Sequence, residues 1–194
     1  MRKYNKLFGI GPAKSGGHSL TEALHLLGVD ARHLGSESHY KRDVQHKDTW
    51  IARDIWQNKL KNKPLLDGVE GHEAYVDWPI GLLFKLFDKE HPDSLFILTY
   101  RNPDDIAASW CRMCYQMKFP HSKPHFQEKA DQVRGHYDEV FRYFADRPNR
   151  LLILDTVNND SNMAKLCKFL ELPEQMSVQP WPHCFNHQDW YLHT

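Results

Sequence analysis

A glycine-rich stretch near the N-terminus is the first part of the chain that could do chemistry. The sequence LFGIGPAKSGGHSLTEALHLLG (Leu7–Gly28) begins with an apolar run, places four glycines within nine residues around Lys14, and continues with leucines at helical spacing. Glycine-rich turns and the helix N-termini that follow them bind anions, most often phosphate, through backbone N–H groups. The stretch therefore predicts a phosphate site with Lys14 as its cation.

Two well-known phosphate loops do not fit this stretch. A Walker A loop requires lysine directly after its second glycine, but Gly17 follows Gly16 here and Lys14 lies inside the loop. A dinucleotide fingerprint begins well at Gly9 and Gly11, but Lys14 occupies the place of its third glycine. Both interpretations therefore fail at particular residues.

A second phosphate-binding pair is predicted in FILTYRNPDDIAASW (Phe96–Trp110). Arg101 follows a buried apolar run and a turn with proline, and Ser109 lies in the helix that follows. An arginine at the end of a strand and a serine one or two helical turns later can converge on one phosphate.

Together these segments resemble the sulfotransferase family. GPAKSGGHSL is similar to the PK[ST]GT[TS] loop with which that family binds the 5′-phosphosulfate of 3′-phosphoadenosine 5′-phosphosulfate, and Arg101 and Ser109 have the separation of its 3′-phosphate residues. Gly17 and His18 replace the two hydroxyl residues of the family loop. The donor-binding residues that the resemblance implies are Lys14, Ser15, Gly16, Gly17, His18, Ser19, Arg101 and Ser109.

The end of the chain extends this resemblance. RLLILDTVNNDSNMAKLCKFLELP followed by WPHCFN is similar to the ending of small bacterial sulfotransferases, so the likeness runs from Leu7 to about Asn186. It implies a P-loop-like α/β fold and the transfer of a sulfuryl group to a hydroxyl or amine of a small-molecule acceptor, without a metal. A homodimer is one assembly that it leaves open.

The resemblance also implies a base shortly before the 3′-phosphate strand, at a strand exit near a proline. Asp77 in VDWP occupies that place, and partial burial beside Trp78 would raise its pKa. An alternative is that Asp77 caps the helix that starts near Pro79. Glu73 and His72, on or beside the same strand, are further candidates for the base.

Two other functions stay open. A nucleotide or small-molecule kinase with a degenerate loop would need Mg²⁺ and an acidic ligand, which Asp155 at a strand end could supply. A nucleotide-binding relative without catalysis is compatible with Gly17 and His18 in place of the hydroxyl residues.

Several cysteines, histidines and aromatic residues could either bind a ligand or pack against their neighbours. Cys111-x-x-Cys114 followed by His121-x-x-x-His125 has the ligand types of a zinc site but a short loop, so packed thiols and surface histidines are favoured. His183, Cys184 and His187 give no stronger case for a metal. The aromatic residues that could line an acceptor site, or simply pack in the core, are Trp50, Trp56, Tyr115, Phe119 and Trp181.

The composition excludes several classes of protein. In 194 residues, 25 Lys and Arg balance 25 Asp and Glu, so no overall field attracts nucleic acid or a membrane surface. No apolar run approaches the roughly 20 residues of a membrane span. Four cysteines do not suggest a disulfide framework, and the expected location is the cytoplasm.

These residues need strands and helices to position them. Apolar runs alternate with helical patterns, which predicts a parallel α/β sheet with helices on both faces, in a single domain over residues 1–194. The expected strands are Leu7–Gly11, Val29–Leu34, a strand within Asp67–Pro79, Ser94–Tyr100 and Arg150–Asp155. The expected helices are Ser19–Leu27, one around Trp50–Trp56, Ile80–Glu90, one that begins after Asn102, Phe126–Ala145 and Ser161–Leu170.

Overall fold

The computed structural model describes residues 3–34, 51–116 and 125–184. In chain order the elements are β1 (Leu7–Gly9), α1 (Gly17–Leu26), β2 (Ala31–His33), α2 (Ile51–Leu60), β3 (Ala74–Val76), α3 (Ile80–Glu90), β4 (Leu95–Tyr100), α4 (Pro103–Gln116), α5 (Phe126–Tyr143), β5 (Leu151–Asp155) and α6 (Asn162–Phe169), with short 3-10 helices at Pro148–Arg150 and Glu174–Val178.

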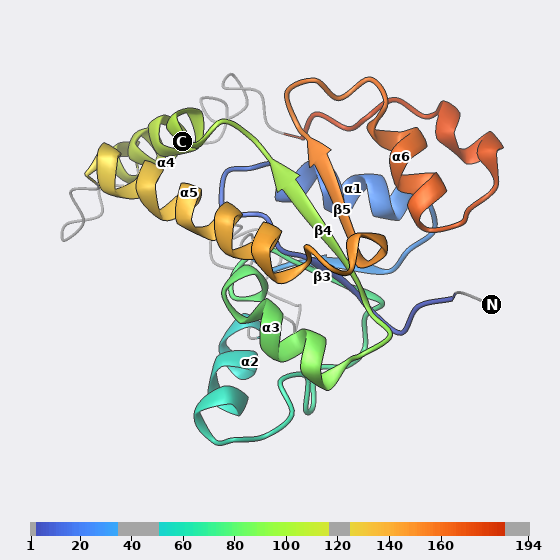
Figure 1. Cartoon of the computed structure of the whole chain (residues 1–194), viewed down its shortest axis with the longest axis horizontal. Coiled ribbons are helices and arrows are strands. Elements are labelled where there is room, and N and C mark those ends of the chain that lie inside the picture. Colours follow the sequence, from blue (N-terminus) through green and yellow to red (C-terminus); the bar gives the residue numbers. More distant parts are fainter. Residues whose placement is uncertain (1–2, 35–50, 117–124, 185–194) are drawn as a thin grey trace.

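The strands form one parallel sheet in the order β2-β3-β1-β4-β5 (Figure 1). The central strand β1 pairs with β3 and β4, so Phe8 lies between Tyr75 and Phe96. Parallel pairing requires crossover connections, and helices supply them along the chain. The prediction of a parallel α/β sheet is therefore confirmed.

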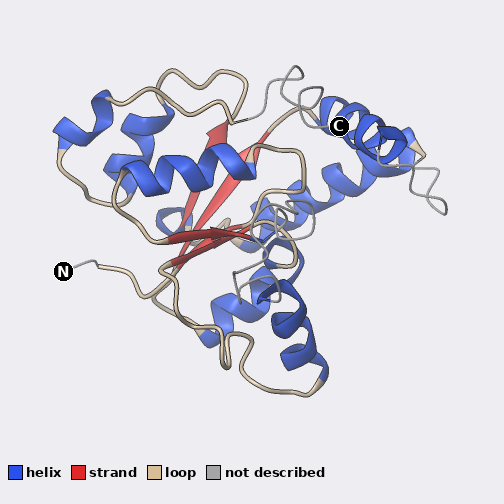
Figure 2. Ribbon diagram, turned by 180° about the vertical axis from the view of Figure 1, so that it is seen from behind, coloured by secondary structure: helices blue, strands red, loops and turns tan. Residues whose placement is uncertain are grey.

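Helices cover both faces of the sheet. Side chains alternate along each strand, so Phe8 packs with α2, α3 and α5 on one face, while Leu7 packs with α1 and α6 on the other. Figure 2 shows the strands between these two groups of helices. The two hydrophobic cores make the sheet a rigid scaffold. Functional residues are then expected in the loops at the ends of the strands.

The ends of the elements differ from the sequence prediction by a few residues. The first strand ends at Gly9 rather than Gly11, and α1 begins at Gly17, two residues before the predicted Ser19. None of the helices in the described segments is long and apolar enough to cross a membrane. Trp50 lies outside the described residues.

A tight turn at Gly28 ends α1. The N–H of Gly28 donates to the carbonyl of His25 and the N–H of Val29 donates to that of Leu24, both at 2.9 Å. This is the Schellman pattern, which needs a left-handed residue after the helix, and Gly28 has a φ of +69°. The tight stop turns the chain directly into β2.

A buried carboxylate joins three elements on the α3 side of the sheet. Asp88 in α3 accepts hydrogen bonds from Arg147 (2.7 Å) and from the hydroxyl of Tyr143 (2.8 Å), and Arg150 forms an ion pair with it at 2.7 Å. Burial opposes the charge, but these partners outweigh it and hold the pKa of Asp88 below its usual range. The cluster fixes α3 against α5 and the start of β5.

Candidate active site

The predicted functional residues follow the carboxyl ends of neighbouring strands. Lys14 follows β1, Asp77 follows β3 and Arg101 follows β4. The carboxyl ends of parallel strands lie at one edge of a sheet, which is where α/β proteins bind ligands. We call this side of the sheet the carboxyl edge, and the structure brings all three residues to it.

The loop after β1 is held in shape by a small hydrogen-bonded cluster. The hydroxyl of Ser15 lies 2.6 Å from both the carbonyl of Pro12 and the hydroxyl of Thr99, and Ser15 is 1% exposed. A Cβ on Gly11 would lie 1.9 Å from the Thr99 hydroxyl, so this position needs glycine. The hydroxyl of Ser15 therefore shapes the loop through contacts within the protein. The role of Ser15 in binding the donor, which the resemblance implies, stays a prediction.

The loop ends at the N-terminus of α1. Gly16 caps the helix with a φ of +111°, and a Cβ there would lie 2.8 Å from Cγ2 of Thr156. Thr156 donates a hydrogen bond to the carbonyl of Ser15 (2.8 Å), which ties the loop to the end of β5. The first N–H groups of a helix, here Gly17–Ser19, have no acceptor within it, so they form a site for an anion.

Lys14 is surrounded by charges at the carboxyl edge. Burial lowers the pKa of its ammonium group; Asp77 opposes this change, while Arg101 and Arg112 add to it. Lys14 also has a φ of +75°, which turns the chain sharply at this residue. Lys14 therefore lies near enough to one carboxylate and two arginines for their charges to affect it.

Arg101 is positioned through its backbone. Its N–H donates to the hydroxyl of Tyr137, and that hydroxyl donates to the carbonyl of Arg101, both at 3.1 Å. The side chain donates from Nη1 to the carbonyl of Lys14 at 3.5 Å, and its buried Nε has no hydrogen-bond partner among the described residues. Ser109 lies half-buried in the second turn of α4, the helix that starts after Arg101.

Asp77 lies where β3 ends and has a φ of +81°. One carboxylate oxygen, Oδ1, accepts the N–H of Trp78 at 2.7 Å. Trp78 precedes α3, whose cap is Pro79 with no side-chain hydrogen bond, so Asp77 does not cap that helix. Burial raises the pKa of the carboxyl group, against the N–H of Trp78 and the nearby charges of His18, Lys14 and Lys129.

The other two candidates for the base lie at the opposite edge of the sheet. Glu73 precedes β3 and accepts the N–H of Asp30 at 2.9 Å, and His72 lies 3.1 Å from the carboxylate of Asp30. Four residues of strand separate Glu73 from Asp77, which is about 13 Å at ~3.3 Å per residue. Glu73 and His72 therefore do not reach the carboxyl edge.

Sequence reasoning missed His33, at the end of β2. Its Nε2 lies 3.3 Å from Oδ2 of Asp77, and its ring stacks on that of His18 with centroids 3.6 Å apart. Burial, together with the charge of Lys14, lowers the pKa of His33 to about 4, against a hydrogen bond of the ring with its own backbone that raises it. No motif marks a histidine on an edge strand, so only the sheet order could reveal it.

Two residues of α5 were also missed. Burial lowers the pKa of Lys129, against the nearby Cys114 and Asp77, and its ammonium lies 4.4 Å from the centre of the Trp110 ring. His136 contacts the carbonyl of Ile10 at 2.8 Å. Both residues lie near the apolar stripe of α5. A polar residue within such a stripe is a sequence pattern that could have indicated them as candidates.

The cysteines are free thiols. Cys111 is half-buried and Cys114 is buried on α4. Cys184 lies within hydrogen-bonding reach of Ser19, and burial raises the pKa of its thiol. Among the described residues no group of three histidines, cysteines or carboxylates has metal-ligand geometry. His121 and His187 lie outside the described residues.

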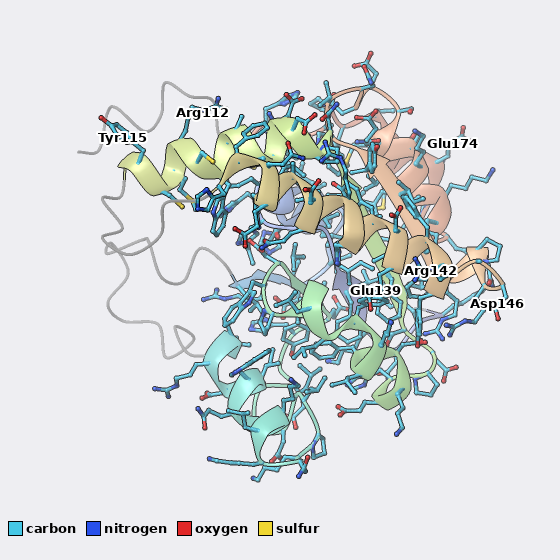
Figure 3. The ribbon with its side chains drawn as sticks, turned by 60° about the vertical axis from the view of Figure 1, so that its left-hand side comes forward. Arg112, Tyr115, Glu139, Arg142, Asp146 and Glu174 are labelled. Carbon is cyan, nitrogen blue, oxygen red and sulfur yellow. The ribbon has the colours of Figure 1, made fainter. Side chains whose placement is uncertain are left out.

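The aromatic candidates lie in different environments. Trp56 stacks on Trp78, next to Asp77, with ring centres 6.0 Å apart. Trp181 belongs to the core beside α1 and α6. Tyr115 is 87% exposed and points outward near the end of α4 (Figure 3). Trp50 and Phe119 lie outside the described residues.

Comparison with known proteins identifies the family and agrees with the fold. The model of a sulfotransferase domain family matches residues 6–132. A comparison with curated protein sequences found no match.

Solved structures share the fold. The sulfotransferase domain from the curacin biosynthetic pathway is 16% identical, over 94% of this chain and 80% of that one, with a TM-score of 0.52. A sulfotransferase from Mycobacterium avium is 12% identical, over 100% and 69%, with a TM-score of 0.57. A sulfotransferase from Alicyclobacillus acidocaldarius is 17% identical, over 96% and 87%, with a TM-score of 0.53.

Proposed function

The chain belongs to the sulfotransferase family, and from this premise we propose that it transfers a sulfuryl group from 3′-phosphoadenosine 5′-phosphosulfate to a hydroxyl or amine of a small-molecule acceptor. The observation that carries the proposal is the meeting of Lys14, Asp77 and Arg101 at the carboxyl edge. The three residues supply a cation, a base and an anion-binding guanidinium within one site.

The residues present fit the donor. The buried Nε of Arg101 has no hydrogen-bond partner among the described residues, and a buried donor of this kind is rare unless a ligand completes it. We assign Arg101 and Ser109 to the 3′-phosphate, and the N–H groups at the start of α1 to the 5′-phosphosulfate. Gly17 and His18 leave these backbone donors in place although they lack the hydroxyls of the family loop.

The proposed chemistry is an in-line displacement at sulfur. Negative charge builds on the oxygen that leaves with the 5′-phosphate, and Lys14 stabilises that charge. Asp77 takes the proton from the acceptor, and its raised pKa makes it a stronger base than an exposed aspartate. Trp78, 47% exposed and adjacent to Asp77, is a wall on which an apolar acceptor can pack.

The two alternative functions have less support. Asp155, the acidic ligand that a kinase would need, accepts hydrogen bonds from Val157 and Asn158 in its own loop. A relative without catalysis would have no use for a base and a cation in one site. Incubation of the protein with the phosphosulfate donor and a panel of phenols, alcohols and amines tests turnover directly.

Binding calorimetry tests the donor site without any acceptor. We expect adenosine 3′,5′-bisphosphate to bind at least about tenfold more tightly than AMP, because a charge-assisted contact to the 3′-phosphate is worth roughly 1.5–3 kcal/mol. Arg101→Ala should abolish most of this preference and leave AMP affinity nearly unchanged.

The matched control is Arg142→Ala, an exposed arginine near the end of α5 and far from Arg112 in Figure 3. It should keep the preference for the bisphosphate. Equal affinities for bisphosphate and AMP in the unmodified protein, or tighter binding of ATP–Mg²⁺, would refute the assignment.

A further inference from the structure

His33 and Asp77 form a buried pair from neighbouring strands. Their side chains are 6% and 14% exposed, and Nε2 of His33 lies 3.3 Å from Oδ2 of Asp77. The parallel register of β2 and β3 pairs His33 with Val76, so the two strands end side by side and present these residues together. The pair is therefore fixed by the sheet rather than by a loop.

Gly17 provides the space for the imidazole. A Cβ at this position would lie 2.8 Å from Nε2 of His33, so any larger residue would displace the ring. The face of the ring is covered by His18 at 3.6 Å. The two residues that depart from the family loop, Gly17 and His18, are thus the two that pack around His33.

A hydrogen bond between the ring of His33 and its own backbone raises the pKa of the ring, so a ring N–H is the donor. Nδ1 is the ring nitrogen nearer the backbone, and we assign the proton of the neutral ring to it. Nε2 then has a lone pair that faces Asp77. A lone pair beside a carboxylate favours the acid, because an O–H can donate to it and a carboxylate cannot.

On the basis of the proposed function, we propose that His33 is a positioning residue for the base: its neutral imidazole accepts a hydrogen bond from the acid form of Asp77 and so holds the proton taken from the acceptor. In this step the O–H bond of the acceptor breaks and its proton moves to Oδ2. The acceptor oxygen forms a bond to sulfur, and the bond from sulfur to the bridging oxygen breaks, which leaves the electron pair on the 5′-phosphate.

The other groups around Asp77 have the opposite effect. Lys14 from the loop, His18 from α1 and Lys129 from α5 face the carboxylate and favour its charged form. His33 is the neighbour on β2 that favours the acid form. The balance between them sets the affinity of the base for a proton, which must be high enough to take one from a hydroxyl.

The test is to measure the pKa of Asp77 by the ¹³C shift of its carboxyl group in the protein without ligand. In His33→Gln an amide N–H would donate to the carboxylate and stabilise the charged form. We expect the pKa of Asp77 to fall by about one unit or more, which is a tenfold loss of proton affinity. An unchanged pKa would overturn the proposal.

Two further variants make the test specific. His72→Gln changes a histidine that pairs with Asp30 at the opposite edge of the sheet, so it should leave Asp77 unaffected. Gly17→Ala keeps the imidazole but displaces it, and it should lower the pKa of Asp77 in the same direction. If Gly17→Ala leaves the pKa of Asp77 unchanged, the position of the His33 ring does not affect that pKa, and the proposal is wrong.

Turnover provides the second measurement. If the protein transfers sulfuryl groups, His33→Gln should move the acidic limb of the pH–rate profile to lower pH and reduce kcat by about tenfold, with bisphosphate affinity within about twofold. An unmoved acidic limb would contradict the proposal. If the protein has no turnover, the proposed function fails, while the carboxyl titration still decides the role of His33.

Discussion

Lys14 combines two properties that rarely occur together in a loop lysine. Its ammonium is partly desolvated, and it lies close to both a carboxylate and two arginines. Desolvation strengthens the interaction of a cation with any negative charge that develops nearby. A positive φ at the same residue shows that the loop holds this side chain in a defined direction at a cost in backbone strain.

Replacement of Lys14 by methionine keeps the length of the side chain and removes its charge. Because the charge matters most when the leaving oxygen becomes negative, kcat should fall by about 10²–10³, with a change of only a few fold in the KM for the donor. Steady-state kinetics with the phosphosulfate donor measures both constants. Lys165→Met, at an exposed position of α6, is the control and should change neither. A rise in KM alone would make Lys14 a binding residue only.

Among the individual residues of the site, the sequence indicated only those that lie in local motifs. Lys14 and Arg101 follow apolar runs that predict strands, so their meeting at one edge follows from the parallel sheet. His33 and Lys129 lie on β2 and α5 without any motif, and their approach to Asp77 depends on strand order and helix packing. The contact of the Ser15 hydroxyl with Thr99, a residue 84 positions away, could not be predicted from a local motif either.

The ends of the helices decide where the functional loops begin. α1 starts at Gly16 in a left-handed conformation and stops at Gly28 in another, so both ends rely on glycine. Sequence reasoning found both ends within two residues, because glycine marks such positions strongly. The three-residue strand β2 was expected to be longer, since the apolar residues Val29 and Leu34 lie close to its two ends.

Two glycine substitutions should have opposite effects on stability. Gly28→Ala has open space for its methyl but a φ of +69°, so it should destabilise the protein by about 1–2 kcal/mol. Gly135→Ala in the exposed interior of α5 also has open space, without a positive φ, and should stabilise by about 0.5–1 kcal/mol. Urea unfolding of both variants measures the two changes in the free energy of unfolding. Changes of the same sign would contradict the argument from backbone conformation.

The α3 side of the sheet is held by long-range polar contacts. Asp88 in α3 is 59 residues from Arg147, which lies beyond the end of α5, and no pattern around either residue predicts that they meet. Such pairs depend on how α3 packs against α5 and the segment that follows it, which is a property of the whole molecule. The fold class could be predicted from alternating patterns, but this cluster could not.

Removal of the Asp88 carboxylate should therefore destabilise the whole domain. Asp88→Asn leaves Arg147 and Arg150 without their anion, and we expect a loss of about 2–3 kcal/mol, below the 3–5 kcal/mol of a fully buried pair because Arg147 is 33% exposed. The lowered pKa of Asp88 means that its contribution is present above pH 3.8 and is lost as the pH falls further, so the two proteins should converge in acid.

Thermal unfolding at neutral pH and below pH 3.8 measures this difference. The control is Asp67→Asn, which removes an exposed pair with Lys63 and should cost less than about 1 kcal/mol. A difference between Asp88→Asn and the unmodified protein that grows in acid would show that the carboxylate does not act through its charge.

The central position of β1 separates the residues assigned to the two substrates of the proposed reaction. The segments after β4 and β5 lie on one side of β1, and Asp77, after β3, lies on the other. In the proposed reaction the first side holds the nucleotide and the second side admits the acceptor. A protein engineer can therefore vary the residues after β3 to seek new acceptors while Arg101 and Ser109 stay unchanged.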